Sequence, residues 1–580
     1  MNWDLSKLYK NGFEDEKFIS DLNSIEGIYA GLVKRAGELD GPEALASLLT
    51  DASEAQKIFG DIMQLIHLTN SANVYDEKAN KLMDKLMVIG MGPSKMMSAV
   101  SRFMADKDVD EYAEANEVLK AHKYLLTRMK KDASHVVAPE LEEVVLRLQM
   151  TGGRAFSTLR DQLDAGLLID FDGEKKPLSA IRGLANSNDA DVRRRAYEAE
   201  IAAYPRIETP MAACLNSIKG EALTMIKLKN YDSVLDTAID GARMDKETLD
   251  ALIQAMYESL PSFRKFFRAK AKKLGYEGGL KFYDIFAPVG SSVREYTIEE
   301  ARALLVDVFS KFSDKMAKFI DNAFEDKWID VYPRPGKVGG AFCSGGNSKG
   351  VSYVLTNFDG SLAAVGTLAH ELGHAYHNDC CKTNPTLMRG YPMPLAETAS
   401  IFNETMMTNT LLKTADKETR VTLLDQQITD AAQVIVDILS RFIFESEVVD
   451  RRADHALTPA EMCEIMLDAQ KKTYGDGLDP EYMHKYMWAC KSHYYSSGLN
   501  FYNFPYAFGE LFGKGVFAQY LKEGDAFVPK YCQLLHSCGS DTIANVAASV
   551  GIDVRDPDFW RASLEVIKGE IDRFCALCEK

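Results

Sequence analysis

The chain has 580 residues, with 68 Lys and Arg against 85 Asp and Glu, which gives a net charge of −17. Hydrophobic residues make up 46% and charged residues 26%, as in globular proteins with a large core. The acidic balance argues against nucleic acid and membrane surfaces as partners, because both need a basic face. The chain has no apolar run long enough for a membrane span and no secretory signal pattern at its start. Its ten cysteines are irregularly spaced, which indicates reduced thiols and a cytoplasmic protein.

The apolar residues recur mainly at steps of three and four, which predicts a mainly α fold. Four stretches read most clearly as amphipathic helices: residues 45–50, 141–149, 301–309 and 434–444. Strand signals are few, and the best are residues 340–343 and 352–358 in the most glycine-rich part of the chain. We therefore expect a helical protein with one small sheet near residue 350.

Two segments suggest a domain boundary. Residues 171–177 read as a charged turn, and residues 203–210 carry two prolines, which discourage a helix across them. The prediction is an N-terminal helical domain over residues 1–200 and a main body over residues 201–580.

The residues that carry chemistry begin with His370-Glu371-x-x-His374. On a helix, residues four apart lie one above the other, so the two imidazoles face one point. Two neutral imidazole nitrogens at that separation suit the tetrahedral coordination of Zn²⁺. Glu371 lies about 100° further round the helix, where it can accept a proton from metal-bound water.

A hydrolytic zinc site needs a third protein ligand and an open position for water. Glu397 and Glu404 follow the motif and lie two turns apart, on one face of an expected second helix. Glu397 is the expected ligand, because turn signals over residues 384–394 allow the second helix to fold back across the first. Glu404 is better suited to orienting a metal-bound imidazole. His377 is a rival third ligand on the helix that carries the histidine motif, which we call the metal helix. It lies nearly two turns from His370.

A tyrosine-rich segment follows at residues 491–509. Three of its phenylalanines are expected in the core: Phe501, Phe504 and Phe508. Four tyrosines and a histidine within fourteen residues are less typical of a core, since each buried hydroxyl needs a partner. Peptide hydrolysis needs hydrogen-bond donors aimed at an oxyanion, and His493, Tyr502 and Tyr506 are candidates for that role.

Three ordered motifs, at residues 370–377, 396–404 and 501–509, resemble the oligoendopeptidase F branch of the thimet oligopeptidase family of zinc metallopeptidases. They read His-Glu-Leu-Gly-His-Ala-Tyr-His, Ala-Glu-Thr-Ala-Ser-Ile-Phe-Asn-Glu and Phe-Tyr-Asn-Phe-Pro-Tyr-Ala-Phe-Gly, and the opening at residues 3–9 is also similar. The resemblance implies a large, helical, prolate zincin-type peptidase with a deep substrate channel and a zinc site at its floor. The main body, residues 201–580, would then be the catalytic domain.

The resemblance also implies a role for each matched residue. The metal ligands would be His370, His374 and Glu397. Glu371 would be the base, and the transition-state donors would be His493 and Tyr506. Tyr502 is a candidate substrate-binding residue, although the spacing between the histidine and the tyrosines varies among family members.

The function expected is a zinc-dependent endopeptidase that hydrolyses internal bonds of short, unfolded oligopeptides. It would hold one Zn²⁺ per chain, and Glu371 would activate a zinc-bound water. Gly340 and Ala341, at the first strand candidate, are expected to bind the substrate backbone by edge pairing, which a glycine favours by allowing close approach.

Two alternatives remain open at this stage. A helical zinc carboxypeptidase can carry the same ligands, but it needs a cation for the terminal carboxylate. A catalytically silent peptide-binding protein would keep the fold without turnover. The terminal pair Cys575 and Cys578 is interpreted as incidental thiols, because a single Cys-x-x-Cys is weak evidence for a metal.

Overall fold

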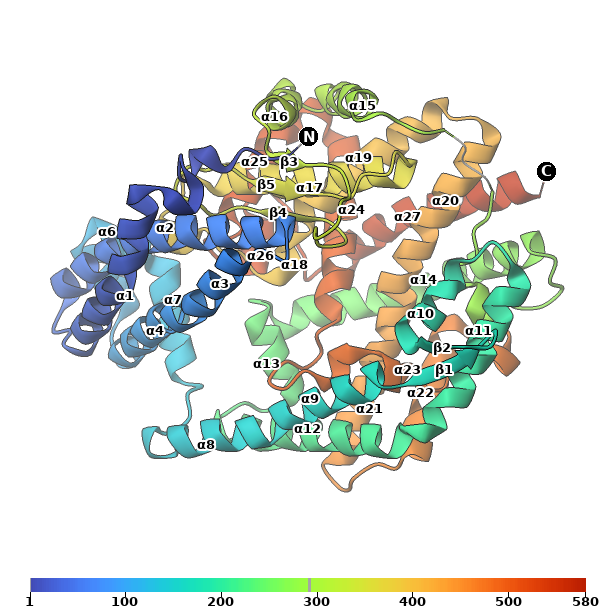
Figure 1. The fold of residues 1–580 in the computed structure, drawn as a ribbon, viewed down its shortest axis with the longest axis horizontal. Coiled ribbons are helices and arrows are strands. Elements are labelled where there is room, and N and C mark those ends of the chain that lie inside the picture. The colour runs from blue at the N-terminus through green and yellow to red at the C-terminus, as the bar shows by residue number, and fades with distance from the viewer. Residues whose placement is uncertain (1, 291–293, 580) are drawn as a thin grey trace. The chain divides into compact units, whose positions relative to one another are not determined.

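The computed structural model, drawn as a ribbon in Figure 1, describes residues 2–290 and 294–579. Its contacts divide the chain into two units. Unit 1 comprises Met1–Val136, Arg294–Thr410 and Gln519–Gly551, and unit 2 comprises Val137–Val293, Leu411–Ala518 and Ile552–Lys580. Both units are discontinuous in sequence. The predicted division of the chain at residue 200 falls inside a helix of unit 2 and stays a prediction.

The α-helices of unit 1 are α1 (Glu16–Gly37), α2 (Pro42–Ala72), α3 (Glu77–Ile89), α4 (Met91–Met104), α5 (Val109–Ala115), α6 (Glu117–Ala121), α7 (Lys123–Ala133), α15 (Ile298–Ser310), α16 (Asp314–Glu325), α17 (Leu362–Cys381), α18 (Met393–Ala396), α25 (Phe527–Ser537) and α26 (Ile543–Ala548). Helix α19 (Thr398–Thr414) starts in unit 1 and continues into unit 2. The predicted helices at residues 45–50 and 301–309 lie within α2 and α15. A capping box at Thr297 and Glu300 explains where α15 begins.

A three-stranded sheet of order β3-β5-β4 lies in unit 1 and contacts α17. Its strands are β3 (Ile329–Asp330), β4 (Phe342–Ser344) and β5 (Tyr353–Leu355). Strand β5 pairs in parallel with β3 and antiparallel with β4, opposing Val354 to Ile329 on one side and to Cys343 on the other. Both strand candidates from the sequence are therefore strands, each shorter than expected. Strand β4 is an edge strand.

The core of unit 1 is built from the apolar faces of its first helices, with Ile25, Leu48, Ile62 and Val100 all fully buried. Within each helix the buried apolar side chains recur at helical spacing, as Leu22, Ile25 and Tyr29 do in α1. Helix α1 packs against both α2 and α4. Tyr353 of β5 belongs to the same apolar cluster. The helical core and the small sheet are thus one packed body.

The α-helices of unit 2 are α8 (Pro139–Thr151), α9 (Gly153–Ala165), α10 (Leu178–Gly183), α11 (Ala190–Ala203), α12 (Glu208–Leu228), α13 (Val234–Gly241), α14 (Lys246–Lys273), α20 (Lys417–Ala432), α21 (Ile438–Arg452), α22 (Pro459–Tyr474), α23 (Met487–Cys490), α24 (Phe504–Glu523, whose end lies in unit 1) and α27 (Pro557–Cys578). An antiparallel pair joins β1 (Leu168–Phe171) to β2 (Glu174–Pro177). Apolar residues from distant segments form the core, among them Tyr204, Leu215, Met462 and Trp488.

Three local expectations change in unit 2. The charged turn at residues 171–177 is part of the β1–β2 hairpin, in which Asp172 and Gly173 take positive φ. The two prolines at residues 203–210 interrupt the helices only briefly, because each lies in the first turn of a helical element, where a missing N–H costs little. The predicted helix at 434–444 begins with a π-helical turn, Gln433–Asp437, before α21.

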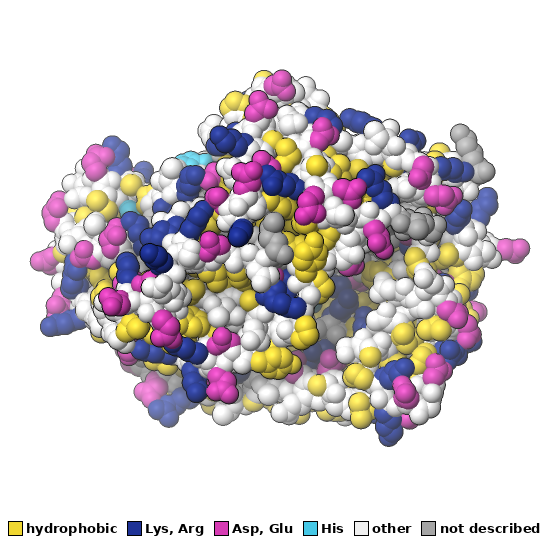
Figure 2. All heavy atoms as spheres, turned by 45° about the horizontal axis from the view of Figure 1, so that its top comes forward, with side chains coloured by type: hydrophobic (Ala, Val, Ile, Leu, Met, Phe, Trp, Pro, Cys, Tyr) yellow, Lys and Arg dark blue, Asp and Glu magenta, His cyan; other side chains and the backbone are white. Residues whose placement is uncertain are grey.

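The predicted mainly α fold with a small sheet beside the metal helix is confirmed, and the substrate channel stays a prediction. Across residues 2–290 and 294–579, none of the helices combines the length and the apolar character that a membrane crossing requires. On the face shown in Figure 2, both acidic and basic side chains occur across the surface.

Candidate metal centre

Helix α17 presents the histidine motif on one face and packs with the other. Ser361 caps its first turn by accepting a hydrogen bond from a backbone N–H. Val365, Leu368 and Leu372 are fully buried, and this apolar stripe fixes the rotation of the helix. The two histidines of the motif therefore lie on the opposite side, and each keeps part of its surface exposed.

His370, His374 and Glu397 converge on one point. The two Nε2 atoms lie 3.2 Å apart, and Glu397 Oε2 lies 3.4 Å and 3.5 Å from them. Three ligand atoms placed tetrahedrally about 2.0–2.1 Å from one Zn²⁺ are separated by about 3.3 Å. The donor set and its spacing therefore fit a zinc ion, and this trio forms a candidate metal site.

Glu397 reaches the histidines because α19 touches α17 at a glycine. A Cβ on Gly373 would lie 2.6 Å from the Ala399 carbonyl oxygen and 2.7 Å from Ser400 Cα, closer than any side chain tolerates. Asn403 of α19 also donates a hydrogen bond to the Ala369 carbonyl of α17. The two helices are in backbone contact at this point, which brings the carboxylates of α19 onto the metal helix.

Glu397 and Glu404 do not share a regular helix face. Glu397 lies at the break between α18 and α19, and its carbonyl accepts the first hydrogen bond of α19. Its carboxylate also accepts a hydrogen bond from Ser400 Oγ at 2.6 Å. Glu404, inside α19, lies 2.8 Å from His370 Nδ1. A proton held on Nδ1 by Glu404 leaves Nε2 of His370 as a lone-pair donor toward a metal.

Glu371 lies beside the three candidate ligands in a cavity that we call the metal cavity. The cavity holds about 650 Å³ and is also lined by Cys343 of β4, Arg389 and Tyr391. Burial raises the pKa of Glu371 to about 7, against the opposing charge of His370. A carboxylate with a pKa near neutrality is suited to take and return a proton.

His377 does not join the cluster. It is completely buried and stacks on Tyr391 at a centroid distance of 4.0 Å. Burial lowers its pKa to about 3, which keeps the imidazole neutral. The structure therefore places the rival third ligand within the packing of α17, away from the convergence point.

The outer edge of β4 faces away from the rest of the sheet. Val354 donates its N–H to the Trp328 carbonyl at 3.0 Å, so the backbone groups of Val354 point toward β3. Cys343 lies opposite Val354 in the antiparallel register, so their pair is not hydrogen-bonded across the strands. The N–H and C=O of Cys343 therefore point to the open edge, and Cys343 lines the metal cavity.

Gly340 and Ala341 lead into this edge. Gly340 has a φ of +77°, in the region that favours glycine, and lies in the turn before β4. Ala341 lines both the metal cavity and a second cavity of about 320 Å³. Thr356 and Thr367 also line the second cavity, which therefore adjoins the first half of α17.

Unit 2 brings the tyrosine-rich segment together around Tyr502. Its ring stacks on His493 with a centroid distance of 5.2 Å, and its hydroxyl lies 3.1 Å from that of Tyr506. All three side chains are partly exposed, and His493 and Tyr502 line a cavity of about 480 Å³. The three phenylalanines expected in the core are buried as predicted: Phe501, Phe504 and Phe508.

The model of peptidase family M3 matches residues 183–566. The chain belongs to peptidase family M3. Oligopeptidase PepF of Bacillus subtilis is 22% identical over 100% of this chain and 87% of its own length. An oligoendopeptidase F homolog of Lactococcus lactis is 25% identical over 100% of this chain and 98% of its own length. The resemblance to the oligoendopeptidase F branch is thus confirmed, and this M3 chain is a peptidase.

A crystal structure of oligoendopeptidase-F from Enterococcus faecium shares the fold. It has a TM-score of 0.70 at 18% identity and covers 97% of this chain and 99% of its own.

Sequence reasoning missed Gly373 and Asn403, which bring α19 of this M3 chain onto its metal helix. The signal available was the glycine inside His-Glu-Leu-Gly-His, at a helix position where glycine is otherwise unfavourable. It also missed Arg389 and Tyr391 as cavity-lining residues. They lie in a loop rich in turn residues, and helical periodicity does not predict where side chains lie in such a loop.

Proposed function

We propose that this M3 peptidase is a zinc-dependent endopeptidase that hydrolyses internal bonds of short oligopeptides. The observation that carries the proposal is the convergence of two Nε2 atoms and a carboxylate oxygen within 3.5 Å of one another, with Glu371 in the same cavity. The names of the relatives, oligopeptidase and oligoendopeptidase F, support peptides as the substrate class.

The four site residues of unit 1 have distinct parts in this proposal. His370, His374 and Glu397 hold one Zn²⁺, which when bound polarises the scissile carbonyl and acidifies water. The Glu371 carboxylate accepts a proton from the attacking water and passes it to the leaving amine. Its raised pKa supports both halves of that transfer, because the carboxylate is neither a very weak base nor a very weak acid near pH 7.

The peptide backbone pairs with the open edge at Gly340 and Ala341 in this proposal. Antiparallel pairing to the edge of β4 would use the outward backbone groups of Cys343, beside Glu371 in the cavity. Proline substitutions at 340 or 341 that left the KM for peptides unchanged would exclude this contact.

His493 and Tyr506 are proposed to donate hydrogen bonds to the oxyanion, and Tyr502 to bind substrate. Their clustering supports a shared role, since Tyr502 touches both of the others. The pKa of His493 is lowered, first by burial and then by the charge of Arg441, so the ring is neutral at pH 7 and can act as a hydrogen-bond donor.

A carboxypeptidase is the second candidate function, and one observation favours it. Arg389 lines the metal cavity, where a guanidinium could bind the free carboxylate of a peptide. The Arg389 Nε already donates to the Asn384 carbonyl, so only its terminal nitrogens remain to bind an anion. Amidation of the substrate separates the two functions, because an endopeptidase still cuts an amidated peptide.

The deciding experiment uses a short internally quenched peptide blocked at both ends, with wild-type and Glu371→Gln protein. We expect wild type to cut it internally. Glu371→Gln should keep one zinc per chain while kcat falls about 10²–10⁴-fold or more. Glu299→Gln, an exposed glutamate of α15 in unit 1, is the matched control and should behave as wild type.

Two results would overturn the proposal. Zinc-loaded wild type that leaves the blocked peptide intact but trims a free C-terminus would make the carboxypeptidase the correct function. Full activity in Glu371→Gln would remove Glu371 from the reaction.

A further inference from the structure

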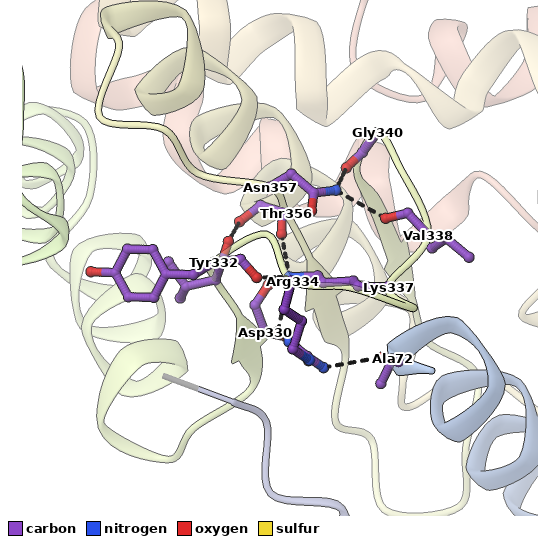
Figure 3. Close-up of polar contacts among 10 residues, drawn as sticks. Ala72, Asp330, Tyr332, Arg334, Lys337, Val338, Gly340, Thr356 and Asn357 are labelled. Carbon is purple, nitrogen blue, oxygen red and sulfur yellow. Dashed lines mark hydrogen bonds and ion pairs between the residues drawn. The ribbon is translucent and has the colours of Figure 1, made fainter. Parts of the chain in front are cut away.

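A buried lysine joins the ends of strands β3 and β5 in unit 1. The Lys337 side chain is completely buried, and its Nζ donates to Asp330 Oδ1 at 2.9 Å (Figure 3). It also donates to three backbone carbonyls, those of Asp330 at 3.1 Å, Tyr332 at 2.9 Å and Thr356 at 2.5 Å. The ammonium group therefore binds one carbonyl at the end of β3, one in the loop after β3 and one directly after β5.

Burial lowers the pKa of Lys337, and the hydrogen bond to Asp330 opposes that effect. For Asp330 burial acts to raise the pKa, but the hydrogen bonds from Arg334 and Lys337 and the positive charges of these two residues together hold its pKa below the usual range. A fully buried ion pair is costly to desolvate, so it contributes geometry more than stability. Its effect is to fix the path of the chain between β3 and β4.

The same loop is tied to the end of α2. Arg334 binds Asp330 through two nitrogens, at 2.6 Å and 2.7 Å, and also donates to the Ala72 carbonyl. The backbone N–H of Val338 donates to the Ser71 carbonyl at 3.0 Å. Residues 334–338 are therefore held between α2 and the sheet.

Asn357 carries this restraint to the edge strand. Its Nδ2 donates to the carbonyls of Val338 at 3.0 Å and Gly340 at 2.8 Å (Figure 3). Asn357 directly follows Thr356, the residue whose carbonyl Lys337 holds. One amide thus fixes the backbone that enters β4, and Asn357 itself lines the second cavity together with Gly340.

We propose that Lys337 and Asn357 are positioning residues for peptide binding, which hold the Gly340–Ala341 backbone in the conformation that accepts an extended substrate. This inference rests on the proposed function. Neither side chain needs to touch the reacting atoms, because both act through the backbone of residues 338–341. Their loss should weaken peptide binding and leave the metal ligands in place.

Asn357→Ala is the primary test, because it removes two hydrogen bonds from a side chain that is not fully buried. We expect the KM for the blocked peptide to rise about tenfold, with kcat within about twofold and zinc content unchanged. Asn357→Asp should raise the KM further, because a carboxylate facing two carbonyls cannot donate a hydrogen bond to either of them. Folded Lys337→Met protein should also show a larger rise in KM than Asn357→Ala.

Asn216→Ala is the matched control. Asn216 of unit 2 likewise donates its Nδ2 to two backbone carbonyls, those of Ala212 and Leu457, at 2.9 Å and 2.8 Å. It should lower the melting temperature while leaving KM unchanged. A KM effect of equal size in both variants would show that Asn357 is merely structural.

Peptide binding measured without turnover keeps this inference separate from the proposed function. A fluorescein-labelled blocked peptide is titrated onto Glu371→Gln protein with and without Asn357→Ala. A wild type that does not cut the blocked peptide overturns the proposed function. Cleavage by wild type combined with equal peptide Kd in the two variants overturns the positioning role.

Discussion

The metal helix α17 and the tyrosine-rich segment of residues 491–509 carry chemistry in different ways. In α17 the ligand spacing follows from regular helix geometry, so His370 and His374 meet at Nε2 atoms 3.2 Å apart. The tyrosine-rich segment runs through short helical turns, and Phe501 takes a positive φ of 51°. The first region therefore depends mainly on local sequence and the second on distant contacts.

The distant contacts of the second region are buried charges. Glu445 of α21 accepts the backbone N–H of Phe501 at 3.0 Å and pairs with Lys219 of α12 at 2.6 Å. Lys219 also donates to the Asn500 side chain. Each partner is almost fully buried, so the loop before Tyr502 is held by groups far away in sequence. Spacing along the chain cannot reveal such a restraint.

Gly373→Ala tests whether the regular spacing of α17 is enough to form the metal site without its contact to α19. The added Cβ would meet backbone atoms of Ala399 and Ser400 at 2.6–2.8 Å, so α19 must move and take Glu397 and Glu404 with it. We expect zinc affinity to fall about 100-fold or more, with activity lost in parallel. Zinc titration and circular dichroism distinguish this from unfolding.

Gly366→Ala in the same helix is the control for that substitution. A Cβ there would meet only the Met407 Cε at 3.5 Å, an ordinary contact. It should stabilise the helix slightly, since alanine is the better helix former. Equal zinc affinity in the two variants would mean that contact with α19 does not build the site.

Tyr506→Phe tests the second region by removing a single hydroxyl. If that hydroxyl stabilises an oxyanion, kcat should fall about 10²–10³-fold while zinc content stays at one per chain. Tyr494→Phe is the matched control, because the buried Tyr494 hydroxyl has no hydrogen-bond partner among the described residues. Equal kcat values for these two variants would remove Tyr506 from the reaction.

The sequence predicts the first region better than the second for a physical reason. Helical periodicity places His370, Glu371 and His374 relative to one another, and it predicts the helices at 45–50 and 301–309. It does not predict that α18 and α19 break at Glu397, because that break depends on how α19 packs on Gly373. The π-helical turn at 433–437 and the buried Lys337 likewise come from long-range packing, which no short window of sequence contains.

Glu404→Gln separates orientation of a ligand from ligation. A glutamine can still accept a hydrogen bond from His370 Nδ1 but carries no charge, so zinc affinity should fall about 10-fold. Glu404→Leu removes the acceptor as well and should approach a 100-fold loss. Competition with a fluorescent chelator measures both. Unchanged affinity in Glu404→Leu would show that the His370 imidazole is oriented by packing alone.

The pH dependence of zinc binding concerns His370 and needs no substitution in the chain. Burial opposes its protonation, but the hydrogen bond that its Nδ1–H donates to Glu404, together with the negative charges of Glu404, Glu397 and Glu371, outweighs burial and raises the pKa of His370 from 6.5 to about 9. The stabilisation of the metal-free fold by this cation is complete below pH 6.5 and is lost as the pH rises through about 9. Zinc needs the neutral imidazole, so binding releases a proton throughout this range.

Zinc affinity should therefore rise about tenfold per pH unit between pH 6.5 and about 9 and then level off. The zinc-induced increase in melting temperature should grow over the same range. In Glu404→Gln the loss of the carboxylate lowers the pKa of His370, so the plateau should begin at a lower pH. A wild-type affinity that does not change with pH would mean that His370 is already neutral before zinc binds. The pairing with Glu404 would then orient the ring without holding an extra proton, and the metal region would depend on α17 and packing alone.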